Sequence, residues 1–478
     1  MKEYSACTTI LVGKNASIDG TTMIARNDDT FRPITPQKFI IEPARHGEKK
    51  HIKSWLNKFE MDLPEDAQRV PAVPNVDYKH RGYYDESGIN QENVAMSCTE
   101  STYGNERTLA FDPLVKDGLD EDCMQTVVLP YIDSARDGVK RLGALIKKYG
   151  SPAGNSVLFG DKDEIWYMEI VTGHHWVAQR IPDDCYAATG NRVAIQEVNF
   201  DDPDNFMYSA GIREFVEKNH LNNSTDGSFS FRDIFGTKDE ADAFYNTPRT
   251  WYGQKLFSPS IEQDPTSQEM PFTRVPEKKI GVEDVQRFLT SHYNGTPYDP
   301  MDTFSSGSEK EQKMFRSIAL DRNQESSILQ IRNDVPAKMA AIQWINMGFY
   351  AYSPYVPFYT NIEDTPLNYK VADHMVDPDS SAYWLYKTLQ VLVEPRYHQY
   401  IYEVNAYRDD CQSYGIGRID LIDEKAKNME GRELSKYLTS ANDETAGVIT
   451  KKTKNLMSKL VRQALNSSKY QFERGDNL

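Results

Sequence analysis

The sequence lacks several features that mark common classes of protein. Its 478 residues contain only five cysteines, which lie far apart and form no CxxC pair: Cys7, Cys98, Cys123, Cys185 and Cys411. An odd number at such spacings argues against a disulfide framework or a thiolate zinc site. It favours a reducing compartment, for which the cytoplasm is the simplest candidate. No apolar run approaches the roughly 20 residues of a membrane helix, so we expect no membrane partner.

Positive charge is also scarce. The chain has 55 Lys and Arg against 71 Asp and Glu, which gives a net charge of −16. Such a surface repels a phosphate backbone, and no stretch combines clustered basic residues with interleaved aromatics, so we expect no nucleic-acid partner. The apolar content of 39 %, with 28 Tyr and 20 Phe, is that of a globular protein with a large core.

The first residues, MKEYSACTTILVG, contain no apolar stretch before Ala6. We therefore expect them not to form a signal peptide. The same absence rejects a lipoprotein interpretation of Ser5-Ala6-Cys7, because the secretion machinery would have no apolar segment to bind.

The hydrophobic pattern predicts an α+β protein, because strands occur towards both ends of the chain with helices between and after them. A polar stretch at about 200–320 is interpreted as a long insertion, and Gly88-Ile89-Asn90-Gln91 is expected to form a turn. Strands are predicted at 8–12, 21–25, 94–98, 156–160, 164–171, 174–181, 326–332, 340–346 and 354–360. Helices are predicted at 130–150, 282–293 and through most of 380–470.

Cys7 stands at the start of the first predicted strand, and Arg26 lies at the end of the second. A turn between two antiparallel strands would bring Arg26 and Asp29 back beside Cys7. A thiol attacks as the thiolate and needs a base. If the chain is cut before Cys7, the new α-amino group, with a reference pKa of about 7.7–8.0, can be that base. Arg26 would hold the thiolate charge, and Asp29 could orient the ammonium.

Other interpretations of these residues stay open at this point. Cys7 could be an inert core thiol, and Arg26 could form a surface ion pair.

Glu169, inside an apolar strand, is expected to be paired or to face a solvated edge rather than to act in acid–base chemistry. His174 and His175 could suggest a metal, but adjacent strand residues point to opposite faces and cannot easily share one ion. We therefore expect neither a metal nor a cofactor.

The segment CTTILVG…ASIDGTTMIARNDD resembles the N-terminus of the C69 dipeptidases, in particular the dipeptidase A group of lactic acid bacteria. That family belongs to the N-terminal-nucleophile hydrolases and is related to penicillin V acylase and bile salt hydrolase. Further segments support the resemblance, which covers the chain from Cys7 to about residue 405: 88–97, 173–178, 188–192, 291–296 and 357–359.

The resemblance implies a four-layer αββα sandwich, with residues 1–6 as a propeptide removed on maturation by the chain itself or by a helper. Residues 7–478 would then form one domain, with the insertion at about 200–320 and a helical region at about 380–470. Cys7 would be nucleophile and, through its freed amine, general base, while Arg26 and Asp29 would match the family's Arg and Asp.

The resemblance also implies an oxyanion hole. Asn191 would be one donor, although an Asn beside Gly190 could equally be a turn residue. The second donor falls near Thr99 or Glu100, and the distal Arg of the related acylases is left without a counterpart. Because a dipeptide carries a free ammonium, Asp28 is our hypothesis for part of the amine subsite.

The implied activity is hydrolysis of a broad range of dipeptides through a thioester, by a protein expected to be a homo-oligomer. Two alternatives stay open. One is a related amidase acting on acylated amines, of the penicillin V acylase or bile salt hydrolase type. The other is a non-catalytic, secernin-like interaction protein.

Overall fold

Two antiparallel sheets form the centre of the molecule in the computed structural model, which describes residues 7–30, 34–77 and 84–467. The first sheet has the order β14 (Thr273–Arg274), β12 (Tyr186–Thr189), β1 (Thr8–Val12), β2 (Thr22–Asp29), β15 (Asn323–Ile331), β16 (Ala341–Met347) and β17 (Val356–Tyr359). The second has the order β13 (Phe206–Tyr208), β11 (Trp176–Ile181), β10 (Ile165–Ile170), β9 (Asn155–Gly160), β8 (Ala95–Ser101), β7 (Ser87–Ile89), β6 (Val70–Ala72) and β3 (Ile40–Glu42). A separate hairpin joins β4 (Lys50–Lys53) and β5 (Glu60–Leu63).

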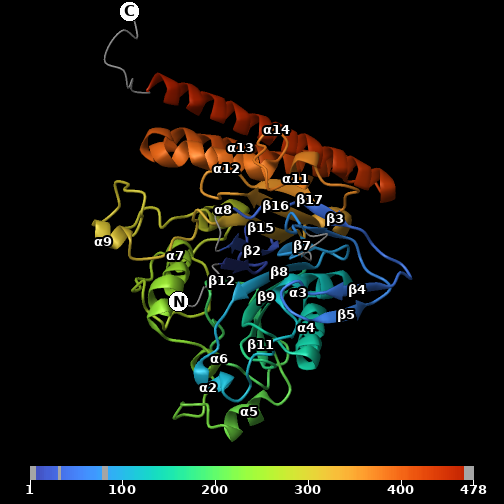
Figure 1. The fold of residues 1–478 in the computed structure, drawn as a ribbon, viewed down its shortest axis with the longest axis vertical. Coiled ribbons are helices and arrows are strands. Elements are labelled where there is room, and N and C mark those ends of the chain that lie inside the picture. The colour runs from blue at the N-terminus through green and yellow to red at the C-terminus, as the bar shows by residue number, and fades with distance from the viewer. Residues whose placement is uncertain (1–6, 31–33, 78–83, 468–478) are drawn as a thin grey trace, which may run out of the picture.

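Helices cover the outer faces of both sheets (Figure 1). One group packs over the first sheet: α7 (Thr247–Phe257), α8 (Val282–Leu289), α12 (Ala382–Val393), α13 (Tyr397–Ala426) and α14 (Gly431–Asn466). α3 (Glu121–Val128) and α4 (Ala135–Tyr149) pack on the second sheet. The remaining helical segments are short: α2 (Glu106–Leu109), η1 (Leu129–Tyr131), α5 (Ile212–Lys218), α6 (Phe231–Phe235), η2 (Asp242–Asn246), α9 (Glu309–Gln312), α10 (Ala337–Ala340), α11 (Leu367–Lys370) and η3 (Glu394–Arg396).

The buried apolar residues separate into layers that match this arrangement. One core lies between the two sheets and joins residues such as Leu11 and Ile24 of the first to Leu158 and Tyr167 of the second. Other cores lie between each sheet and its helices. The predicted α+β class and the helical C-terminal region are therefore confirmed.

Most predicted strands occur within one to three residues of their expected positions, because local β-propensity and alternation agree there. The turn predicted at Gly88–Gln91 is wrong in its first half. Gly88 lies within β7 and pairs with both Ala72 and Met96. A side chain at this position would meet the carbonyl oxygen of Pro71 at 2.8 Å, so the glycine serves close strand packing rather than a turn. The turn follows directly, and Asn93 adopts a left-handed φ of 59°.

The segment at 200–320 is integrated into the body of the protein. Its strands β13 and β14 extend one edge of each sheet, and α8 places Val285 and Leu289 in the core beneath the first sheet. This packing allows the segment to supply side chains to the site described below.

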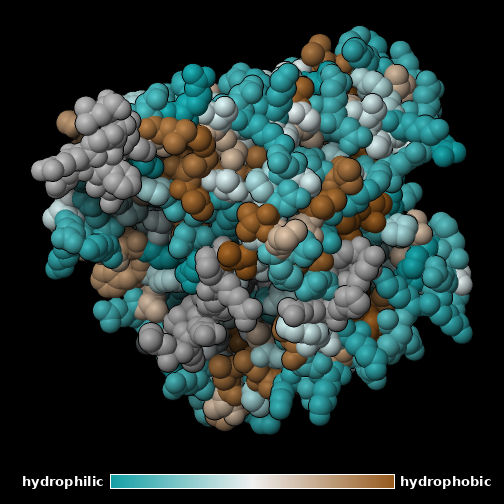
Figure 2. Space-filling model, turned by 45° about the horizontal axis from the view of Figure 1, so that its top comes forward, coloured by the Kyte–Doolittle hydropathy of each residue, from teal (hydrophilic) through white to brown (hydrophobic). Residues whose placement is uncertain are grey.

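The surface carries mainly hydrophilic residues, with hydrophobic residues in several separate patches on the face that Figure 2 shows. The C-terminal helices contribute exposed apolar side chains, among them Val391, Tyr402, Leu421 and Leu465. Within the described ranges, no helix combines the length and the apolar content that crossing a bilayer requires.

One part of the space between the two sheets is polar. Glu325 of β15 is 1 % exposed, and its carboxylate accepts hydrogen bonds from Ser87 Oγ at 3.0 Å and Ser327 Oγ at 2.7 Å. Ser87 belongs to the second sheet, so the contact bridges the layers. Burial raises the pKa of Glu325 to about 7, with the nearby Asp28 adding to the shift.

We predict that Glu325→Gln stabilises the fold at alkaline pH. The folded pKa lies above the unfolded value, so the neutral acid contributes stability at low pH, and this contribution is lost as the pH rises through about 7. The variant should raise the free energy of unfolding at pH 8 by up to ~3 kcal/mol and change it little at pH 5. Urea unfolding at both values measures this. Glu48→Gln, at an exposed position, is the control. An equal effect of Glu325→Gln at the two pH values would contradict the prediction.

Candidate active site

Strand register places Cys7 between two other predicted site residues. β1 pairs with β2 on one side and β12 on the other, and Thr9 lies opposite both Arg26 and Thr189. Continuing each antiparallel register by two residues brings Cys7 opposite Asp28 and Asn191.

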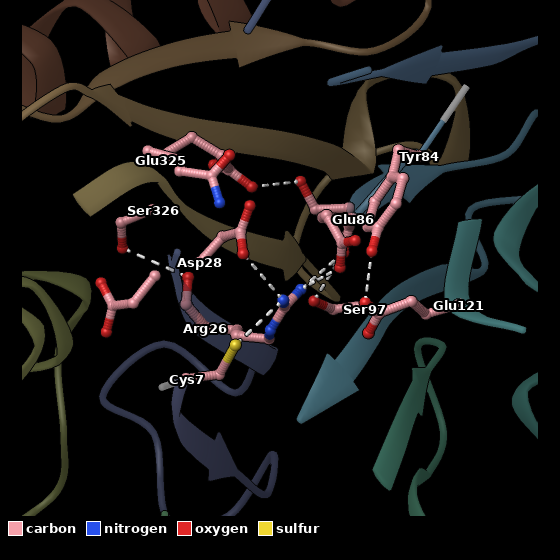
Figure 3. A network of polar contacts seen from close by, with 12 residues as sticks. Cys7, Arg26, Asp28, Tyr84, Glu86, Ser97, Glu121, Glu325 and Ser326 are labelled. Atoms are coloured by element: carbon pink, nitrogen blue, oxygen red, sulfur yellow. Dashed lines mark hydrogen bonds and ion pairs between the residues drawn. The ribbon is translucent and has the colours of Figure 1, made fainter. Parts of the chain in front are cut away.

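The predicted contact between Cys7 and Arg26 is present. Arg26 Nη2 donates a hydrogen bond to Cys7 Sγ at 3.1 Å (Figure 3). The two side chains are 3 % and 1 % exposed, so Arg26 does not form the surface ion pair considered as an alternative.

Two carboxylates share the guanidinium of Arg26. Its Nη2 lies 3.1 Å from Asp28 Oδ1, and its Nη1 lies 2.7 Å from Glu86 Oε2, and all three side chains are buried. Ser97 Oγ and Arg26 Nη1 both donate to the backbone carbonyl of Glu86, at 2.9 and 3.3 Å. Together with Glu325, Asp28 and Glu86 form the inner acid cluster, with Arg26 among them (Figure 3).

Burial dominates the protonation of these groups. It raises the pKa of Asp28 to about 6 and that of Glu86 well above its ordinary value, in both cases against the attraction of Arg26. Burial likewise raises the pKa of the Cys7 thiol to about 12, opposed by Arg26 and by the backbone N–H of Asp29. The sulfur is therefore a neutral thiol near pH 7, and a base must remove its proton before it can attack.

Arg249 links Cys7 to Asn191 and was not anticipated from the sequence. It lies on α7 and is fully buried. Its Nη1 donates to the backbone carbonyl of Cys7 and, at 3.1 Å, to Thr8 Oγ1, while its Nη2 donates to Asn191 Oδ1 at 2.9 Å. A side chain at Gly190 would come within 2.6 Å of this guanidinium, which explains why this position holds a glycine.

The amide of Asn191 is oriented by this contact. Its side chain is completely buried, and Nδ2 finds no hydrogen-bond acceptor among the described residues. Because buried polar groups are almost always paired, this free donor makes Asn191 a candidate for holding an oxyanion.

Glu169 holds the backbone that follows Asn191. It is fully buried in β10, and its carboxylate accepts from the backbone N–H groups of Ala194 at 2.5 Å and Ile195 at 3.2 Å. These contacts agree with the interpretation of Glu169 as a paired residue rather than an acid–base group. They anchor the segment that carries Asn191.

Asp29 lies in a different environment from Arg26 and Asp28. Its carboxylate forms an ion pair with Arg316 and a hydrogen bond with Asn323 Nδ2, and it lies 3.4 Å from the hydroxyl of Tyr350. Arg316 also donates from Nη1 to Thr8 Oγ1 at 3.1 Å. A second arginine therefore reaches the residue next to Cys7, and this contact too was missed from the sequence.

Thr99 and Glu100 lie on β8, which runs beside β9 with a register shift between Ser97 and Glu100. Their side chains fall outside what the structure describes. The assignment of a second oxyanion donor to this segment stays a prediction.

The remaining candidates of the sequence lie elsewhere. His174 Nδ1 is 2.9 Å from an oxygen of Asp112, and His175 Nδ1 is 3.0 Å from Ser209 Oγ, so the two imidazoles have separate partners. The four other cysteines are buried and free. The aromatic cluster predicted as core or pocket wall is buried: Phe349, Tyr350, Tyr352, Tyr355, Phe358 and Tyr359.

Comparison with known proteins supports the resemblance noted in the sequence. Residues 6–410 match peptidase family C69. The chain is 45 % identical to a probable dipeptidase of Latilactobacillus sakei, over 100 % of this chain and 99 % of the relative. It is 42 % identical to probable dipeptidase B of Lactococcus lactis, over 99 % of each chain, and 38 % identical to dipeptidase A of Lactobacillus helveticus, over 96 % and 97 %. With these matches along almost its whole length, the chain belongs to peptidase family C69.

Proposed function

We propose that this protein is a cysteine dipeptidase whose nucleophile, Cys7, becomes an N-terminal residue when residues 1–6 are removed. The contact between Arg26 Nη2 and Cys7 Sγ carries the proposal, because it aims a buried cation at the atom that must become negative. The family membership and the dipeptidase names of the relatives support the same activity.

The first step of the proposed reaction is attack on the scissile carbonyl. The free α-amine of Cys7 takes the proton from its own thiol, directly or through a water, and Arg26 stabilises the thiolate. Sulfur bonds to the carbonyl carbon, and the oxyanion accepts a hydrogen bond from Asn191 Nδ2. By resemblance, Asp29 orients the ammonium and the Thr99–Glu100 segment supplies the second donor.

Collapse of the tetrahedral intermediate breaks the carbon–nitrogen bond. The ammonium of Cys7 returns its proton to the leaving nitrogen, so the C-terminal amino acid departs as a neutral amine and the N-terminal one remains as a thioester. Water, deprotonated by the same amine, then hydrolyses the thioester and regenerates the thiol. Arg249 assists by fixing the carbonyl of Cys7 and the amide of Asn191. The steps require no cofactor.

The layered sheets and helices support assignment to the four-layer sandwich of the N-terminal-nucleophile hydrolases, with residues 7–478 as one domain.

We place the protein in the cytoplasm because its described cysteines are all free. We also propose that it forms a homo-oligomer through the exposed apolar side chains of its C-terminal helices. A mass of one chain, measured by light scattering, would exclude the homo-oligomer.

Removal of the leader is expected to produce dipeptidase activity, and loss of the Cys7 thiol is expected to abolish it. Intact-mass analysis of the purified protein should give a chain that begins at Cys7, and this form should hydrolyse unblocked dipeptides. Cys7→Ala should lose activity by at least about a thousandfold, since no covalent intermediate can form. Cys98→Ala, which changes another buried thiol, is the control. A chain that retains MKEYSA and hydrolyses no dipeptide would favour the secernin-like alternative, whereas activity unchanged in Cys7→Ala would exclude Cys7 as the nucleophile.

Asp28 is proposed to bind the substrate's ammonium as part of the inner acid cluster. The wild type should hydrolyse a dipeptide about tenfold or more faster, in kcat/KM, than its N-acetylated form or a conjugated bile salt, and Asp28→Asn should reduce this preference. Asp112→Asn, at a carboxylate paired with His174, is the control. A preference untouched by Asp28→Asn would remove Asp28 from the amine subsite. Faster hydrolysis of the acylated substrates would favour the amidase alternative.

A further inference from the structure

Arg316 lines a cavity of about 330 Å³. Its wall includes the cationic side chains Arg316 and Arg322 and the apolar or aromatic side chains Met301, Leu320, Phe349 and Tyr352. This volume lies at the lower end of the range for small-molecule sites, and the mixture of apolar wall and a few polar groups is the usual lining of such sites.

The cavity adjoins the proposed catalytic centre through Arg316. One arm of its guanidinium donates to Thr8 Oγ1 at 3.1 Å, and the other is paired with Asp29. Arg316 therefore has one side on the residues around Cys7 and another on the cavity.

Arg322 provides a cation that forms no ion pair with the described residues. Its half-buried side chain lines the cavity, and among the described residues its guanidinium has neither a hydrogen bond nor an ion pair. A half-buried guanidinium without a counter-charge favours an anionic ligand, and its planar shape suits a carboxylate.

The cavity also has acidic groups, which are engaged elsewhere or exposed. Glu394 accepts a hydrogen bond from Gln390 Nε2 at 2.9 Å, and Asp321 is exposed. Lys387, whose pKa burial lowers to about 8, donates to the backbone carbonyl of Asp321 at 3.0 Å. Of the charged side chains in this wall, Arg322 is therefore the one available to an anion.

The direction of the proposed reaction relates this cavity to the leaving group. The α-amine of Cys7 must face the leaving nitrogen in order to protonate it, and Asp29 is the residue proposed to hold that amine. Since Arg316 pairs with Asp29 and also lines the cavity, the cavity lies next to the residue that would hold the amine in the proposed reaction. The inner acid cluster lies on the thiol side, around Arg26.

We propose that this cavity is the subsite for the leaving amino acid of the dipeptide, with Arg322 binding its free α-carboxylate and the apolar wall receiving its side chain. The inference rests on the proposed function and adds a second specificity element to it. The inner acid cluster selects the free ammonium at one end of the substrate, and Arg322 selects the free carboxylate at the other. Side chains of differing size fit the apolar wall, which accounts for a broad range of dipeptides.

The test compares Leu-Leu with Leu-Leu amide, which lacks the carboxylate charge but keeps the scissile bond. In the mature wild type, kcat/KM should be about ten- to a hundredfold higher for the free acid, as expected for one charge-assisted hydrogen bond. Arg322→Gln should abolish most of that ratio by lowering kcat/KM for Leu-Leu while leaving the amide unchanged. Arg287→Gln is the matched control, because Arg287 lines another cavity and is paired with Asp284.

The outcomes separate the inference from the function on which it rests. A wild type that hydrolyses neither substrate overturns the proposed function. A wild type that prefers Leu-Leu, with the same ratio in Arg322→Gln, overturns the carboxylate subsite alone. An equal fall for both substrates also overturns it, provided that thermal unfolding shows Arg322→Gln to be as stable as the wild type.

Discussion

The site depends on one buried contact, the hydrogen bond from the guanidinium of Arg26 to the sulfur of Cys7. Cys7 directly precedes β1 and Arg26 lies on the neighbouring strand β2, so the backbone ladder sets their relative position. The buried guanidinium of Arg26 forms ion pairs with Asp28 and Glu86, and these pairs offset part of the cost of burying the charged groups. Removing Arg26 would leave buried acids without their counter-charge, which is more destabilising than the net worth of the pair. Arg26 and its two acidic partners therefore act as one unit.

The strand β2 presents two different electrostatic environments around Cys7. Arg26 and Asp28 lie within the inner acid cluster, with Glu86 and Glu325 beside them. Asp29 instead meets Arg316, near Thr8 and Arg249. In the proposed reaction this difference corresponds to the two charged ends of a dipeptide. A substrate with both termini free would then match the site, whereas blocking either terminus would lose one of the two attractions.

The part of the site that lies within thirty residues of the N-terminus could be predicted from the sequence. A β-run, a turn and a second β-run determine that Arg26 returns to Cys7, and the structure has this register. Arg249 could not be predicted in this way, because 242 residues separate it from Cys7 and only the packing of α7 brings them together. Glu86 and Arg316 were missed for the same reason. Gly88 was misread as a turn because its close contact with Pro71 comes from a strand that the sequence pattern did not reveal.

The central claim is that Cys7 becomes a nucleophile only as a chain terminus. The pH dependence of its alkylation by iodoacetamide, followed by mass spectrometry, tests this most directly. In the mature protein, the reaction should rise through an apparent pKa near that of an α-amine, about 7.7–8.0. A variant blocked in leader removal should react only at far higher pH, in line with a thiol pKa of about 12. Identical profiles for the two forms would contradict the account.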